Sequence, residues 1–104
     1  MKLHRISRVE ALRHPVVRVT FDDGLAGELD LTDEIATQPL FAPLRDEALF
    51  QAVAVDETGR SFGWNVREPG EEIDLCADAV RIHCETRIVE ALADGYARRR
   101  SAAE

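Results

Sequence analysis

Apolar and polar residues alternate in two neighbouring segments near the N-terminus, residues 16–21 and residues 25–31. A period of two residues is typical of β-strands. The stretch Asp22-Asp23-Gly24 separates the segments, which predicts a hairpin whose three-residue loop ends on a glycine with positive φ. This register pairs Val17 with Leu29 and gathers the apolar side chains on one face of the hairpin.

The same register predicts further cross-strand pairs, namely Phe21–Leu25, Val19–Gly27 and Arg18–Glu28. Asp22 and Asp23 are interpreted as turn residues, because a cation site needs more oxygen ligands than follow them in the chain. A strand is also expected upstream, with Pro15 in the connection because proline cannot donate to a ladder. Its predicted pairs are Ser7–Phe21, Val9–Val19 and Ala11–Val17.

The segment after the hairpin loses the alternation and is expected to form short helical turns that cover the sheet. Thr32 is the predicted N-cap of the first turn, which is expected to end at Gln38-Pro39. Asp46 is predicted to cap a second turn. The apolar side chains expected to pack on the sheet are Leu40, Phe41, Leu44, Leu49 and Phe50.

A second hairpin is predicted in VAVDETGRSFGWNV, with the four-residue loop Glu57-Thr58-Gly59-Arg60. The predicted pairs are Val55–Phe62 and Val53–Trp64. The single tryptophan is expected in the core because it alternates with Phe62 and Val66, and an interface role is the alternative. A short strand, residues 73–75, is expected after the next turn.

Helical periodicity begins after this strand. Apolar residues recur at three- and four-residue steps, at Val80, Cys84, Ile88, Ala91 and Leu92. Gly95 is expected to loosen or end the helix, and residues 96–104 are expected to form a flexible basic tail. The predicted class is α+β, with a single domain over residues 1–95. It contains a small, mostly antiparallel sheet of β-hairpins, short helical turns between them and a C-terminal helix.

The composition fits one soluble domain, since the chain has 104 residues, of which 45% are hydrophobic and 32% are charged. Its net charge is −7, and six acids with no lysine or arginine lie between Val19 and Leu44. Because phosphate backbones attract clustered bases, a nucleic-acid partner is disfavoured and a basic protein partner is allowed. We expect a cytoplasmic protein with no membrane helix and no secretory signal.

The candidate chemical groups form no catalytic or metal-binding motif. Cys76 and Cys84 are eight residues apart, which fits neither a redox pair nor a zinc knuckle, so reduced, partly buried thiols are expected. His83, Cys84 and Glu85 diverge by about 100° per residue on a helix and cannot bind one ion together. Ser61 or Cys76 would need His83 for nucleophilic catalysis, and no motif marks either pairing. We therefore expect no catalytic residue, no metal and no cofactor.

The order of the motifs resembles domain-of-unknown-function family 2442 (DUF2442), a bacterial family. The matching stretches are VRVTFDDG followed by GELDL, then LFAPLRDEALFQAVAVDETGRSFGW, and then IDLCADAV. The resemblance runs from about Val9 to Val80 and implies a small α+β domain without established catalytic residues. It also implies a partner module encoded in arrangements suggestive of toxin–antitoxin pairs. Some relatives add a C-terminal helix-turn-helix domain, which we do not expect here because few residues follow Ile88.

The predicted function is a non-catalytic protein-interaction module, the acidic partner in a toxin–antitoxin-like two-gene pair. Glu28, Asp30, Asp33 and Glu34 are the candidate residues of the partner surface. The alternative is that these carboxylates only keep the protein soluble. The second functional hypothesis is a regulatory domain that binds a small ligand or nucleic acid. Such a domain would form a homodimer through the C-terminal helix, Val80 to Leu92, and the arginines of the tail would contact DNA.

Overall fold

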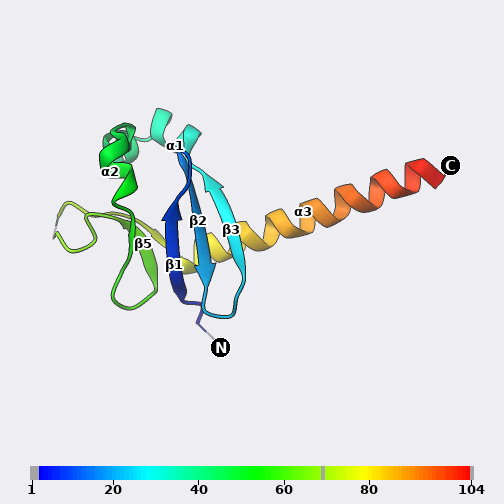
Figure 1. Cartoon of the computed structure of the whole chain (residues 1–104), viewed down its shortest axis with the longest axis horizontal. Helices are drawn as coiled ribbons and strands as arrows, with labels where there is room; N and C mark the ends of the chain where they lie inside the picture. The colour runs from blue at the N-terminus through cyan, green and yellow to red at the C-terminus, as the bar shows by residue number, and fades with distance from the viewer. Residues whose placement is uncertain (1–2, 69, 104) are drawn as a thin grey trace.

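The computed structural model describes the backbone of residues 3–68 and 70–103, and the side chains of residues 3–68 and 70–95. These residues form two three-stranded antiparallel sheets, with helices between and after the strands (Figure 1). The predicted α+β class is confirmed. The strands are β1 (Ile6–Ala11), β2 (Val16–Phe21), β3 (Ala26–Asp30), β4 (Ala54–Val55), β5 (Ser61–Trp64) and β6 (Ile73–Cys76). The helices are α1 (Thr32–Thr37), the 3-10 helix η1 (Pro39–Arg45), α2 (Glu47–Gln51) and α3 (Ala77–Ala103).

The first sheet has β2 at its centre, between β1 and β3. The register of β2 and β3 is the predicted one, with the pairs Val17–Leu29, Arg18–Glu28 and Val19–Gly27. The N–H of Phe21 donates to the carbonyl of Leu25 at 2.7 Å, and the N–H of Gly24 donates to the carbonyl of Phe21 at 3.0 Å. Gly24 has a φ of 93°, which is the conformation that the three-residue loop requires.

The predicted pairing of β1 is correct at two positions and wrong at one. The pairs Val9–Val19 and Ala11–Val17 form as predicted. Ile6, and not Ser7, lies opposite Phe21, because the register shifts between Ile6 and Arg8. Such a bulge adds one residue to a strand, and here it turns Ile6 into the core and leaves Ser7 exposed.

The short helices between the two sheets begin at different kinds of cap. Leu31 is the N-cap of α1 and makes no side-chain hydrogen bond, so the prediction of Thr32 as N-cap is wrong. The carboxylate of Asp30 accepts the backbone N–H of Thr32 at 3.0 Å, and it thereby satisfies a free donor at the helix start. Asp46 caps α2 as predicted, with its carboxylate accepting the N–H of Ala48 at 2.9 Å.

The second sheet has β5 at its centre, and the Val55–Phe62 pair forms as predicted. The predicted Val53–Trp64 pair does not form. The helix α2 ends at its cap, Ala52, and the chain is extended only from Ala54 onwards. Trp64 is fully buried, and its Nε1 donates to the carbonyl of Phe50 at 2.8 Å. The predicted core role of Trp64 is confirmed.

One hydrophobic core lies between the two sheets, the short helices and the start of α3. Its buried side chains are Ile6, Val17, Val19, Phe21, Leu29, Leu31, Ile35, Leu44, Phe50, Phe62, Trp64, Ile73, Ala77, Val80 and Cys84. Leu40 is exposed, although it was expected in this core. Residues three apart share a face of a 3-10 helix, so η1 directs Phe41 and Leu44 toward the sheets and leaves Leu40 outside.

The helix α3 has 27 residues and leaves the domain on the side of β3 (Figure 1). The prediction that it ends near Gly95 is wrong, because its backbone is helical to Ala103. A single glycine costs about 1 kcal/mol relative to alanine, which is too little to end a helix. The predicted tail overlaps this helix, and its arginine side chains lie outside the described residues. The radius of gyration, 15.9 Å, exceeds the roughly 13 Å of a compact chain of this length because α3 extends outward.

Candidate functional site

The helix α3 crosses the first sheet where Cys84 meets Gly27. A Cβ on residue 27 would lie 2.5 Å from Sγ of Cys84, so only glycine allows the strand and the helix to approach this closely. Burial raises the pKa of the Cys84 thiol, which is therefore neutral and contributes by packing. The predicted burial is correct for Cys84 but wrong for Cys76, which lies on the solvent side at the end of β6.

Arg81 joins α3 to the tip of the first hairpin. Its guanidinium donates to Asp23 at 2.9 Å and to Glu85 at 2.8 Å. The same group lies 5.0 Å from the centre of the Phe21 ring, a cation–π arrangement. The hydrogen bond from Arg81 lowers the pKa of Asp23 to about 2, so this carboxylate is charged at neutral pH. Asp23 is therefore both a turn residue and the anchor of α3.

The helix α3 carries large apolar side chains that are exposed to solvent, both where it packs on the sheet and beyond Cys84. Ile82, Val89 and Leu92 are 66%, 64% and 66% exposed. Ile82 and Val89 are seven residues apart and point in nearly the same direction, with Glu85 between them, whereas Leu92 follows Val89 by one turn and is rotated toward Ile88. We call these three exposed apolar side chains the α3 ridge. The apolar stripe predicted from periodicity is thus buried only as far as Cys84, since Ile88 is also exposed.

A groove lies between β3 and α3, on the side of α3 that faces away from Ile82. We call it the β3–α3 groove, and it is lined by Ala26, Gly27, Glu28, Cys84, Arg87, Ile88 and Ala91. A second hollow adjoins it, because Glu28 and Arg87 line both. Ile82 and Val89 of the ridge lie on the side of α3 away from the groove, whereas Leu92 lies next to Ile88, so the two surfaces adjoin on one helix.

The structure brings two of the four predicted partner-surface residues together beside this groove. Glu28 and Asp30 both line the second hollow, while Asp33 and Glu34 lie in the first turn of α1. Asp33 is exposed. Oε2 of Glu34 is buried and has no hydrogen-bond partner among the described residues, so Glu34 is turned partly away from solvent.

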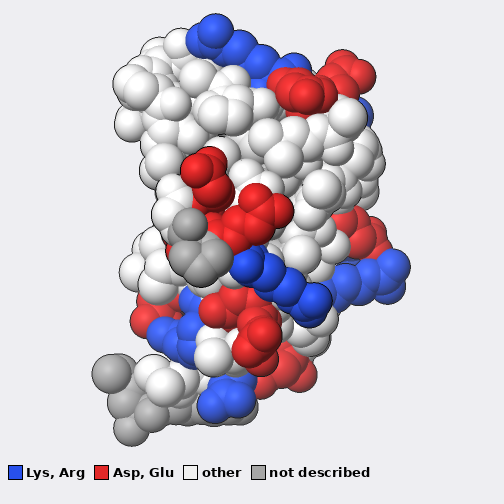
Figure 2. All heavy atoms as spheres, turned by 90° about the vertical axis from the view of Figure 1, so that its left-hand side faces the viewer, with Lys and Arg blue, Asp and Glu red and all other residues white. Residues whose placement is uncertain are grey.

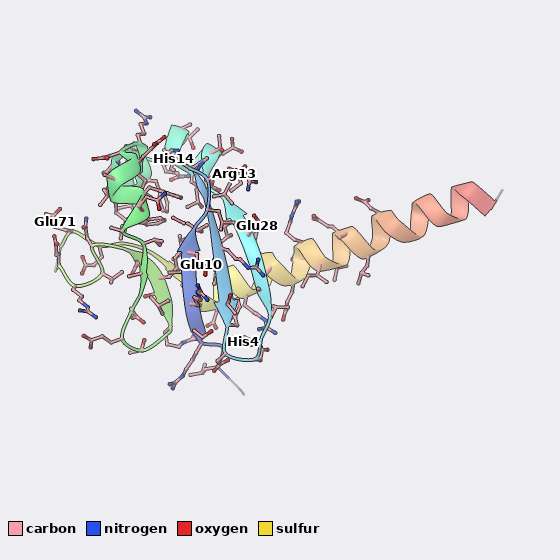
Figure 3. All side chains as sticks on the ribbon, in the orientation of Figure 1. His4, Glu10, Arg13, His14, Glu28 and Glu71 are labelled. Atoms are coloured by element: carbon pink, nitrogen blue, oxygen red, sulfur yellow. The ribbon has the colours of Figure 1, made fainter. Side chains whose placement is uncertain are left out.

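The predicted surface is less acidic than the sequence suggests. The carboxylate of Glu28 lies 3.7 Å from the guanidinium of Arg13, which comes from the connection between β1 and β2 (Figure 3). His83 and Arg87 of α3 line the same hollow. The hydrogen bond from Thr32 lowers the pKa of Asp30, which keeps that carboxylate charged. The surface therefore carries both signs of charge, brought together by folding.

The other candidate chemical groups lie apart from one another. Ser61 and Cys76 are paired across β5 and β6, whereas His83 lies in the hollow beside β3. His14 connects the first sheet to η1, because its Nε2 lies 2.8 Å from the carbonyl oxygen of Leu44. Within residues 3–68 and 70–95, no group of three His, Cys, Asp or Glu side chains is placed to hold a metal ion. No helix in the described part of the chain is both long and apolar enough to span a membrane.

The face of the molecule farthest from the free end of α3 shows interleaved charges. Figure 2 shows acidic and basic side chains side by side over its lower half, below a mostly uncharged upper part. Neither sign dominates this view, so the face presents no single-sign patch of the kind that steers a charged partner.

Comparisons with protein-family models, with curated proteins and with solved structures find no match.

Several residues that shape the two surfaces were not identified from the sequence. Gly27 had a signal, since it is the one small residue in an otherwise apolar row of its strand, which suggests a close approach by another element. The sequence gives no comparable signal for Arg81 and Arg87, because charged residues on a helix are usually solvated. Ile82 and Val89 fall outside the apolar stripe of the helix, and residues off that stripe are expected to be exposed.

Proposed function

We propose that the protein is a non-catalytic protein–protein interaction module of the DUF2442 type, and that it binds a basic partner protein through the α3 ridge. The observation that carries the proposal is the exposure of Ile82, Val89 and Leu92 on a helix that projects from its domain. Exposed large apolar side chains that lie close together, as Val89 and Leu92 do one turn apart, mark interaction sites, because their burial against a partner is favourable.

The charge of the chain supports a basic protein as the occupant of the ridge. The net charge is −7, although the two glutamates on the same helix as the ridge, Glu85 and Glu90, form ion pairs with Arg81 and Arg87. A basic protein is attracted at long range, whereas a second copy of this chain is repelled. A role in a toxin–antitoxin-like two-gene pair is part of this proposal, and it rests on the resemblance of the sequence motifs.

A homodimer is the second candidate, because two α3 ridges can also cover each other. The apolar row at Ile82, Val89 and Leu92 favours this alternative. Sedimentation velocity of the full chain at increasing concentration separates the two. A monomer at all concentrations removes the homodimer, and a concentration-dependent dimer that Leu92→Glu abolishes assigns the ridge to a second copy.

Affinity purification of the tagged full chain from its native cells tests the proposal. We expect a discrete basic protein to co-purify with the wild type and to be lost with Val89→Glu and with Leu92→Glu. Ala79→Glu is the matched control, because it adds the same charge at an exposed position of α3 away from the outer half of the ridge. If all variants capture the same proteins, or if none captures any, the proposed function is wrong.

A further inference from the structure

We propose that β3 is the docking edge for an extended segment of the partner protein, which adds a strand to the first sheet above the β3–α3 groove. This inference rests on the proposed function, because it specifies how the partner is held. The expected segment alternates apolar and basic residues. Strand addition to an exposed sheet edge is a common mode of peptide recognition, in which the main chain supplies affinity and alternate side chains supply specificity.

The free edge of β3 presents unpaired backbone groups. The N–H of Phe21 donates to the carbonyl of Leu25, and the N–H of Leu31 donates to the carbonyl of Pro15. The backbone polar groups of residues 25 and 31 therefore point toward β2. In an antiparallel ladder this direction alternates, so Ala26, Glu28 and Asp30 direct their N–H and C=O groups away from the sheet. No backbone partner for these three residues occurs among the described residues, since β3 is at the edge of its sheet.

The part of α3 after Cys84 passes below the place where a strand added to β3 would lie. Its side chains Ile88 and Ala91, which line the groove, form the floor of the proposed docking site. Arg81 packs on Phe21 of β2, and Cys84 packs on Gly27 of β3. Three helical residues rise about 4.5 Å, which matches the roughly 4.8 Å between neighbouring strands. The next three or four residues along the same side of α3 reach Arg87 and Ile88, and no strand of the described chain lies above them.

Two independent features therefore coincide at one position. The backbone of β3 can hold one more strand, and the side chains of Ile88 and Ala91 lie below that position. A strand placed there would direct every second side chain down onto Ile88 and Ala91 and the others outward. Arg87 also lines the groove, and its guanidinium lies 3.4 Å from Glu90 of the same helix.

The charges of the edge favour a basic segment. Glu28 and Asp30 are exposed on the outer face of β3, and a basic residue directly opposite a carboxylate stabilises a strand pair. Glu28 already lies opposite Arg18 of β2 on the outer face of the sheet. Its contact with Arg13 is weak, because the carboxylate and the guanidinium are 3.7 Å apart on side chains that are 55% and 74% exposed. A partner lysine or arginine can replace it.

The same charges disfavour a second copy at this edge. An antiparallel pair of β3 strands centred on Glu28 places the two Glu28 carboxylates opposite each other, and a shift of one pair places Glu28 opposite Asp30. Like charges directly opposite are destabilising. The buried face of each first sheet is also covered already by its own core, which leaves no room there for the α3 of another copy.

The test uses the isotope-labelled full chain and the synthetic peptide Lys-Val-Lys-Val-Lys-Val-Lys as the probe. We expect the peptide to slow amide hydrogen exchange at Ala26, Glu28 and Asp30 and to leave the exchange of β6 unchanged. The control peptide Glu-Val-Glu-Val-Glu-Val-Glu has the same backbone and the opposite charge, and it is expected to give no protection. Protection by both peptides, by neither, or at other residues only would overturn the inference.

Two variants locate the binding site. Glu28→Pro removes an outward N–H without removing a bond to β2, and we expect the affinity for the basic peptide to fall about tenfold or more. Ile88→Glu changes the floor and leaves the strand intact, and it is expected to weaken binding similarly. Thr86→Glu is its matched control, because it adds the same charge at an exposed position of α3 that belongs neither to the groove nor to the α3 ridge. Unchanged binding by Ile88→Glu overturns the inference even if Glu28→Pro does not fold.

The failure of this inference can be told apart from the failure of the proposed function. If Leu92→Glu loses the native partner while Glu28→Pro and Ile88→Glu retain it, the docking edge is wrong and the interaction module stands. If the basic peptide protects the edge but no partner depends on the ridge, the edge is supported and the ridge proposal is wrong. Protection of the same amides by increasing protein concentration alone would assign the edge to a second copy and would overturn the inference.

Discussion

The guanidinium of Arg81 lies 2.9 Å from the carboxylate of Asp23, so an ion pair joins α3 to the tip of the first hairpin. The side chain of Arg81 is only 12% exposed, and it also covers the ring of Phe21. Together with the packing of Val80 and Cys84 in the core, this ion pair holds α3 against the sheet beside the β3–α3 groove.

The first prediction concerns the pH dependence of that ion pair. The pKa of Asp23 is lowered to about 2 in the folded protein, from an ordinary value of about 4 in the unfolded chain. A lowered carboxyl pKa contributes stability that is fully present above the unfolded value and is lost as the pH falls through the folded value. We expect the wild type to be more stable than Asp23→Asn at neutral pH.

Urea unfolding of both proteins should show this difference shrinking from about pH 5 to about pH 2. A difference that stays constant over this interval would contradict the assignment.

The second prediction concerns the contact between Gly27 and Cys84. Gly27→Ala places a methyl group 2.5 Å from Sγ of Cys84, and we expect it to lower the free energy of unfolding by about 1–3 kcal/mol. Cys84→Ala in the same chain removes the sulfur atom, so part of this loss should be recovered in the double variant. Denaturant unfolding of the four proteins measures the coupling. Strictly additive effects would mean that the helix does not pack on the strand at this point.

The third prediction concerns the buried tryptophan. Trp64→Phe removes the donor to the carbonyl of Phe50, which would then lack its hydrogen bond in the core. We expect the free energy of unfolding to fall by about 1–3 kcal/mol from this unsatisfied carbonyl alone, with a further loss from the smaller ring. Thermal and urea unfolding give the size of the change. Stability equal to that of the wild type would contradict a buried, hydrogen-bonded Trp64.

The local fold was predictable wherever one strand pair or one turn decides it. The register of β2 and β3 followed from Val17, Leu29 and the loop glycine, because a slip by one residue would place charges in the core. The bulge in β1 was not predictable, because it depends on which of Ile6 and Ser7 the finished core accepts. The N-cap of α1 was missed because the carboxylate of Asp30 accepts the N–H of Thr32, which places Thr32 inside the helix and makes Leu31 the cap.

The site was predictable only in part, because it is made by elements far apart in the sequence. Glu28 and Asp30 were identified as surface carboxylates, but their neighbours Arg13, His83 and Arg87 come from other elements. Periodicity located α3, yet it could not show that burial stops at Cys84, since that depends on the width of the sheet and not on the helix.

Amide hydrogen exchange along α3 in the full chain, measured before and after addition of the co-purified basic partner, shows whether α3 is the binding element. In the free protein we expect the amides after Cys84 to exchange faster than those of residues 80–84, which pack on the sheet. Binding of the partner should then slow exchange around Val89 and Leu92. If these amides are already as protected as those near Cys84, or if the partner leaves them unchanged, α3 is not the binding element.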